Sequence, residues 1–274
     1  MITIAILLAA RTWGEPEPLC QLTSKVIDES SGLAVSPTQK DTFYTINDSG
    51  DKPRFFRFNS KGDVTGEFAL SKATALDWEE MFAVKLKGKS WIYLADCGDN
   101  AEKRPFITLY RTQEPTGASR AIDKMDAFKI TYPDRAHNCE GVFPDPKTGD
   151  VYFVTKVPFG KSSIYKVKNP SKSGDYKAEL VGQYAFSTGS MNGMLVTGAA
   201  VSPDGKNVVV RTYSGAVEFA VKGRFEDWWK QSPISVKLAA EKQGEAICYG
   251  QDGKSLYTSS EGTPCPISRL LLKN

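Results

Sequence analysis

Residues 30–35 read SSGLAV, and four later segments repeat this pattern of a small or acidic residue before an apolar run. They are WEEMFAV from Trp78, CEGVF from Cys139, VTGAAV from Val196 and GEAIC from Gly244. Aligned with one another, the five segments place one oxygen-bearing residue each at an equivalent position: Ser31, Glu79, Glu140, Thr197 and Glu245. We call these five residues the ring. Their spacings of 48, 61, 57 and 48 residues are near the roughly 40–50 residues typical of propeller blades.

Each repeat also holds further apolar runs that are typical of strands. The second runs are rich in aromatic and β-branched residues and follow turn signals: DTFYTIND from Asp41, SWIYLAD from Ser90, GDVYFVTK from Gly149, GKNVVVRTY from Gly205 and GKSLYTSSE from Gly253. A third run follows in every repeat, and a fourth in the first four repeats. The missing strand of the fifth repeat is predicted at residues 19–25, which would close the circle and remove an exposed edge. The sequence therefore predicts an all-β, five-bladed propeller of four-stranded antiparallel blades, with a six-bladed propeller as the alternative.

The 274 residues are expected to form one propeller domain over residues 19–274, because no linker or low-complexity run divides them. Residues 1–18 are predicted to be a signal peptide or a disordered segment. MITIAILLAA has an apolar run of the length of a signal-peptide core, too short to span a bilayer. A secreted or periplasmic location follows as an expectation.

The charge distribution excludes one class of partner. Thirty-five basic residues and 32 acidic residues give a net charge of +3 and are mixed along the chain, unlike a nucleic-acid-binding surface. No segment outside the N-terminus is predicted to cross a membrane, and a monomer is expected.

The five cysteines leave two interpretations open. Disulfides of Cys20 with Cys265, and of Cys97 with Cys139, would support an oxidising compartment. Alternatively, all five are reduced core residues. A zinc site is not expected, because the sequence has no CxxC or HxxxH spacing and His137 is its only histidine.

The ring predicts a cation site. Innermost strands line the central channel of a propeller, so equivalent residues of these strands converge on the axis. Three carboxylates brought together without a cation would repel, and at least one would take up a proton. Three carboxylates and two hydroxyls, supplemented by backbone carbonyls or water, form an all-oxygen donor set of the size that Ca²⁺ accepts, whereas Mg²⁺ prefers a tighter octahedron and more water. The alternative is that these residues hydrogen-bond to exposed backbone amides.

The order Ser, Glu, Glu, Thr, Glu resembles the axial calcium set of the calcium-activated nucleotidases (apyrases). This resemblance implies a five-bladed propeller with a central Ca²⁺ bound by Ser31, Glu79, Glu140 and Glu245, with Thr197 in place of a serine. A second resemblance covers most of the chain, through strings such as INDSGDKPRFFRF, YLADCGDNAEKRP and CEGVFPDPKTGDVYFVTK. These look like bacterial secreted propellers related to the phytase-like esterase families. That resemblance implies the fold and does not name a substrate.

Polar residues at the ends of the second strands suggest chemistry around the cation. Lys156, Arg211 and Arg104 would favour an anionic ligand, and His137 or Asp48 could act as a general base toward a bound water. Asp48, Asp96 and Asp99 could instead cap turns. The predicted catalytic set is His137, Asp48, Arg211 and Lys156.

Two classes of function stay open. One is a calcium-dependent hydrolase of phosphoesters, anhydrides or esters that takes a small anionic molecule. The other is a non-catalytic module with a structural calcium that recognises a glycan, peptide or protein. The sequence shows no repeated aromatic platform in equivalent loops, which favours the small anionic ligand.

Overall fold

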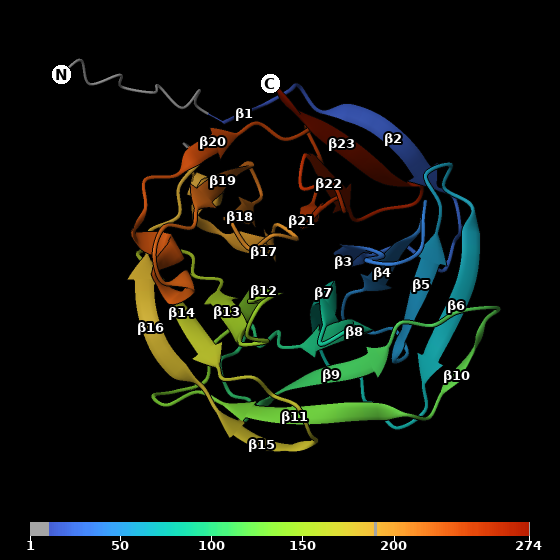
Figure 1. Cartoon of the computed structure of the whole chain (residues 1–274), viewed down its shortest axis with the longest axis horizontal. Coiled ribbons are helices and arrows are strands. Elements are labelled where there is room, and N and C mark those ends of the chain that lie inside the picture. Colours follow the sequence, from blue (N-terminus) through green and yellow to red (C-terminus); the bar gives the residue numbers. More distant parts are fainter. Residues whose placement is uncertain (1–10, 189–190, 274) are drawn as a thin grey trace.

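Five sheets surround one axis in the computed structural model, which describes residues 11–188 and 191–273 (Figure 1). The predicted all-β, five-bladed propeller is confirmed. Residues 1–10, which hold most of the predicted signal peptide, lie outside the described residues. No helix within the described ranges is long and apolar enough to cross a membrane.

The repeated segments form the innermost strand of each blade, and the later runs follow outward in chain order (Figure 1). The innermost strands are β3 (Ser30–Val35), β7 (Trp78–Leu86), β12 (Cys139–Pro144), β17 (Val196–Val201) and β21 (Gly244–Tyr249). The second strands are β4 (Phe43–Asn47), β8 (Lys89–Asp96), β13 (Val151–Thr155), β18 (Asn207–Thr212) and β22 (Ser255–Ser260). The third strands are β5 (Arg54–Phe58), β9 (Ile107–Gln113), β14 (Ser162–Val167), β19 (Gly215–Ala220) and β23 (Cys265–Lys273). The fourth strands are β6 (Val64–Leu70), β11 (Met125–Thr131), β16 (Glu179–Tyr184) and β20 (Ile234–Val236).

The N-terminal segment completes the fifth blade, as predicted. Strand β2 (Glu17–Leu22) pairs antiparallel with β23, and the short strand β1 (Thr12–Trp13) pairs with the last residues of the same strand. Strand pairing therefore begins at Thr12, and the predicted domain start at residue 19 falls inside β2. Both ends of the described chain lie in one blade (Figure 1).

The described residues of the two long intervals between ring residues form no sixth blade. They hold short strands that join a neighbouring blade: β10 (Arg120–Ile122) pairs parallel with β6, and β15 (Gly174–Lys177) pairs parallel with β11. Each of these strands extends the outer edge of the preceding blade. The extra length in the sequence thus straps blades 1, 2 and 3 together.

Aromatic side chains pack between the blades. The described residues include two 3₁₀ segments, η1 (Met191–Met194) and η2 (Phe225–Lys230), and the second contributes to this packing. Trp228 of η2 is fully buried and lies edge-on against Phe143 and Phe219, with ring centroids 5.6 and 5.1 Å apart. This short segment therefore seals the seam between blades 3 and 4.

The cysteines are free thiols, so the predicted disulfides are not present. The Sγ of Cys97 donates to the backbone oxygen of Cys139 at 3.0 Å, and both residues are fully buried. Burial raises the pKa of Cys20 and of Cys265 to about 11. Thiols held in the protonated form are poor nucleophiles. Four of the five free thiols are buried and Cys20 is partly buried, so the structure agrees with the reduced alternative except that Cys20 lies at the edge of the core.

Candidate metal centre

A β-bulge positions every ring residue. The pairing between the innermost and second strands shifts register at Ser31, Glu79, Glu140, Thr197 and, in the fifth blade, at Glu245. A bulge adds an unpaired residue to one strand and re-aims its side chain. Because the same irregularity recurs in all five innermost strands, the five ring residues take equivalent positions on strands that surround the axis (Figure 1). None of the five is more than 4% exposed.

The two ring hydroxyls bridge neighbouring blades. The Oγ of Ser31 donates to the backbone oxygen of Glu79 at 2.7 Å, and the Oγ1 of Thr197 donates to the backbone oxygen of Gly244 at 3.1 Å. Each hydroxyl proton is used in this bond. The oxygen lone pairs remain as acceptors, which is the form in which a hydroxyl binds a cation.

The three ring glutamates are held at unfavourable places for negative charge. Burial raises the pKa of Glu140 and of Glu245 to about 7, and the pKa of Glu79 is raised well above its usual value by burial and by the nearby Glu140. The Oε2 of Glu245 is buried and has no hydrogen-bond partner among the described residues. A buried carboxylate oxygen without a partner is costly and calls for a ligand.

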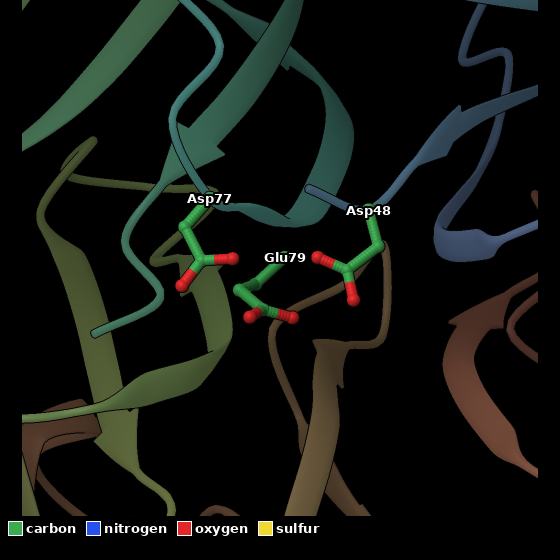
Figure 2. A group of neighbouring side chains, drawn as sticks. All are labelled: Asp48, Asp77 and Glu79. Carbon is green, nitrogen blue, oxygen red and sulfur yellow. The ribbon is translucent and has the colours of Figure 1, made fainter. Parts of the chain in front are cut away.

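Two further carboxylates join Glu79 from different blades. Asp48 follows β4, Asp77 precedes β7, and one ligand oxygen of each lies within 4.8 Å of the others and of Glu79 (Figure 2). A Cβ at Gly98 would lie 2.4 Å from the Oδ2 of Asp77 and 2.4 Å from the Oε1 of Glu79. The loop after β8 therefore needs a glycine to pass these carboxylates. The structure thus brings Asp48, a predicted catalytic residue, and Asp77 close to one ring residue.

Lys156 is the counter-charge of the site. Its Nζ lies 2.8 Å from both carboxylate oxygens of Glu140 and donates to the hydroxyl of Tyr213 at 2.9 Å. Burial lowers the pKa of this lysine, but the Glu140 carboxylate outweighs burial and the net shift is upward. Within the described ranges, Lys156 forms an ion pair with Glu140 alone, and the carboxylates of Asp48, Asp77, Glu79 and Glu245 form none. The site is short of positive charge.

His137 belongs to a different cluster. Its Nε2 lies 3.0 Å from an Asp134 carboxylate oxygen and 2.6 Å from the hydroxyl of Tyr165, and its ring packs edge-on against Tyr132. The imidazole is buried among these side chains. The geometry therefore does not favour His137 as the general base at the ring.

Arg211 holds two blades together and is not free to bind a ligand. Its guanidinium is 1% exposed, forms an ion pair with Glu241, and donates from Nη1 to the backbone oxygens of Ala246 at 2.7 Å and Ser259 at 3.1 Å. Glu241 is itself buried and accepts from Thr258. These contacts tie β18 of blade 4 to blade 5 and leave the guanidinium closed to solvent.

Two of the aspartates in the DCGDN loop support the backbone, as the turn-capping alternative predicts. Asp96 accepts from the backbone N–H of Asp77 at 3.1 Å and pairs with Arg104 at 2.8 Å. Asp99 accepts from the backbone N–H of Arg104 at 2.7 Å. Arg104 is thus committed to the loop after β8, where it also donates to the backbone oxygen of Gly98 at 2.8 Å.

A second layer closes the axis directly below the ring. It consists of the residues that follow the ring residues: Gly32, Glu80, Gly141, Gly198 and Ala246. Glu80 is the one large member, and its Oε2 crosses from blade 2 to accept from the backbone N–H of Ala199 in blade 4, at 3.1 Å. A Cβ at Gly198 would lie 3.3 Å from that oxygen. We call this layer the waist; four small residues leave room for one glutamate that fills the axis.

The raised carboxyl pKa values predict how stability depends on pH in protein stripped of divalent cations. A carboxyl whose folded pKa is raised binds more protons when folded, so its contribution is complete below the unfolded pKa and lost as the pH passes the folded pKa. For Glu140 and Glu245 this window runs from 4.5 to about 7. In EDTA we expect the unfolding free energy to be lower at pH 7.5 than at pH 5, by on the order of 2–3 kcal/mol. The urea midpoint should fall accordingly.

The control for this pH effect is a matched pair of variants. Glu245→Gln should flatten the pH dependence, whereas Glu179→Gln, at a mostly exposed site on β16, should leave it unchanged. A midpoint that rises between pH 5 and pH 7.5 would contradict the proposed charge state of the ring.

The comparisons with known proteins agree on the fold. No protein-family model matches the chain, and no curated protein matches it in sequence. The major allergen of Malassezia sympodialis is similar in structure, with a TM-score of 0.58 at 12% identity over 93% of this chain and 95% of the allergen. A putative oxidoreductase (glucose dehydrogenase) from Thermus thermophilus has a TM-score of 0.51 at 11% identity, over 94% of this chain and 99% of that protein. A gluconolactonase from Xanthomonas campestris has a TM-score of 0.50 at 12% identity, over 96% of this chain and 86% of that enzyme. At these identities the likeness shows the propeller fold alone.

Proposed function

We propose that this chain is an exported calcium-binding propeller that hydrolyses a small ester or phosphoester at the ring. The observation that carries the proposal is the cluster of Asp48, Asp77 and Glu79, whose ligand oxygens lie within 4.8 Å of one another and form no ion pair with a lysine or arginine among the described residues. Buried like charges at this density repel one another, and a divalent cation offsets the repulsion. The order of ring residues also resembles that of the calcium-activated nucleotidases, a relationship that we propose on the ring alone.

The donor set fits calcium. Every candidate ligand offers oxygen, and Ca²⁺ takes six to eight oxygen ligands in a flexible geometry. The residues that would hold the ion are the predicted ring, Ser31, Glu79, Glu140, Thr197 and Glu245, together with Asp48 and Asp77. Of these, only Asp48, Asp77 and Glu79 have carboxylate oxygens within 4.8 Å of one another. The unpartnered Oε2 of Glu245 and the close approach of Gly98 to two carboxylates both support a ligand here.

The bound cation would polarise an ester or phosphoryl oxygen and offset the negative charge of an anionic substrate. The chain itself supplies a base and a positive charge. Asp48 and Asp77 lie half-buried at the mouth, and burial raises the pKa of Asp77 to about 6, which suits a base at neutral pH. Lys156 stands beside Glu140 and Tyr213 as a positive charge that favours an anionic substrate. Arg211 and His137 take no part in this proposal.

Fold analogy supports a hydrolase only at the level of the scaffold. A gluconolactonase and a putative oxidoreductase share the propeller, and one fold hosts many chemistries. The proposed reaction therefore rests on the ring and its neighbours.

Isothermal titration with CaCl₂ tests the cation site. We expect one Ca²⁺ per chain in the native protein, at least tenfold weaker binding in Glu79→Gln and Glu245→Gln, and unchanged binding in Glu179→Gln. Each ring variant removes one charged ligand, whereas the control removes the same charge from an outer strand. Absence of binding heat, or equal affinity in all four proteins, would refute the site.

Activity is tested separately, with calcium saturating. A screen of nucleotides, phytate, p-nitrophenyl esters and lactones should give turnover that Asp48→Asn or Asp77→Asn lowers about 100-fold or more, the usual cost of losing a general base. If calcium binds and every substrate class is inert, the ring serves a non-catalytic module that recognises a glycan, peptide or protein.

A further inference from the structure

A cavity of about 240 Å³ occupies the axis on the side of the waist away from the ring. The ring lies near the start of the innermost strands, and the cavity is lined by residues further along the same strands and by the turns that follow. Each blade contributes an apolar wall residue: Leu33, Met81, Phe143, Ala199 and Ile247. The mouth of this cavity therefore opens on the opposite face of the propeller.

The rim of this cavity follows a simple sequence rule. The residue six positions after each ring residue lines it: Pro37, Lys85, Pro146, Pro203 and Gln251. Three prolines stiffen the rim, because their φ angle is fixed. Lys85 and Gln251 are the polar members.

The waist separates the cavity from the ring. The Glu80 side chain crosses the axis to Ala199, and a Cβ on Gly32 would lie 2.6 Å from the backbone nitrogen of Met81. Ala199 and Met81 line the cavity on its inner side. A molecule in the cavity would thus contact the far side of the waist and leave the ring carboxylates untouched.

Most polar groups of the lining are already used. Tyr249 donates to Glu218 at 2.6 Å, Ser202 donates to Asp204 at 2.7 Å, and the Gln251 amide donates to the backbone oxygen of Ser36. Lys85 is different: it is exposed, and its ammonium makes no hydrogen bond or ion pair with any residue in the described ranges. No aspartate or glutamate lines the cavity.

We propose that this cavity binds a small amphiphilic carboxylate, with its apolar body between the innermost strands and its carboxylate on Lys85. The apolar wall favours a hydrocarbon chain, and the unpaired ammonium at the rim favours a negative head group. A cavity of about 150 Å³ can hold benzene, so the larger volume here suits a molecule of about ten non-hydrogen atoms. Octanoate has that size and is the probe of choice.

Isothermal titration compares octanoate with octanol and octylammonium, which keep the chain and change the head group. Octanoate is expected to bind with a Kd of roughly 0.1–1 mM, a range set by its size, and at least fivefold more tightly than either analogue. Lys85→Gln should weaken octanoate five- to twentyfold and leave octanol unchanged. Lys87→Gln, in the same hairpin but outside the lining, is the matched control and should bind like the native chain.

Filling the cavity tests where the chain lies. Ala83→Phe and Ala200→Phe each enlarge a wall residue, and each should abolish binding of both octanoate and octanol while the far-ultraviolet circular dichroism spectrum stays native. Two variants on different blades are used because one may fail to fold. Octanoate binding that survives both substitutions, or that ignores Lys85→Gln, would overturn the proposal, as would equal affinity for octanol.

The proposed calcium site is kept apart from this test. Octanoate titrations in EDTA and in Glu140→Gln should give the native affinity, because the waist lies between the two sites. If octanoate binding requires calcium or disappears in Glu140→Gln, the carboxylate binds at the ring and the cavity proposal is refuted, while the cation site itself stands.

Discussion

A chain that begins at Lys25 is expected to lose cooperative unfolding, or to melt at least 15 °C below the full chain. Its fifth blade would lack β1 and β2, leaving the nine-residue strand β23 as an open edge. It would also lose the fully buried Leu22 and the Arg11–Glu218 ion pair that ties the N-terminal segment to blade 4. A drop of this size corresponds to several kcal/mol in a domain of about 250 residues. Thermal melts followed by circular dichroism measure it.

The closing strand offers a matched pair of point variants. Leu22→Asp buries a charge in the fifth blade and should act like the truncation, whereas Gln21→Asp, at the exposed neighbouring position, should change the melt little. A synthetic peptide of residues 11–24 should restore part of the lost stability by adding the strand in trans. A truncated chain that melts like the full one would show that blade 5 does not need its N-terminal strands.

Arg211→Met is expected to cost about 3–5 kcal/mol of unfolding free energy, the usual result of leaving one partner of a buried ion pair uncompensated. Glu241 would keep its charge in a site where its side chain is 3% exposed. Two backbone oxygens that accept from the guanidinium would also lose their donor. Urea unfolding measures the loss.

Two further variants identify the cause of that loss. Arg224→Met breaks ion pairs of a largely exposed side chain and should change the unfolding free energy little, because solvent screens such pairs. Removing both charges in Arg211→Met/Glu241→Met should recover part of the stability, because no buried charge is then left alone. A loss below about 1 kcal/mol in Arg211→Met would mean that the Arg211 contacts between blades 4 and 5 contribute little to stability.

The blade count and the closure could be predicted from the sequence because one local pattern marks every innermost strand. The pattern is a bulge residue with an oxygen-bearing side chain, followed by buried residues that are mostly small or apolar. These residues are neighbours in the sequence, and the spacing between copies of the pattern gives the repeat length. The strands β10 and β15 could not be predicted in the same way. They are short and pair with a neighbouring blade, so nothing in their own sequence indicates where they attach.

The site was only partly predictable for a related reason. The ring positions follow from the repeat, but the roles of Arg211 and His137 depend on partners that the repeat does not align. Glu241 lies in a loop 30 residues from Arg211, and Asp134 and Tyr165 flank His137 from outside the pattern. Glu80 did carry a signal: it is a glutamate where the other four segments have glycine or alanine.

That single departure from the repeat decides whether the axis is open from end to end. The Glu80 side chain reaches from blade 2 to blade 4. It therefore divides the axis into two separate faces instead of leaving one continuous channel. The ring side carries the carboxylates of Asp48, Asp77 and Glu79, and the other side holds the apolar cavity with Lys85 at its rim. Substitutions on one face can therefore change its ligand while the waist, which both faces share, stays in place.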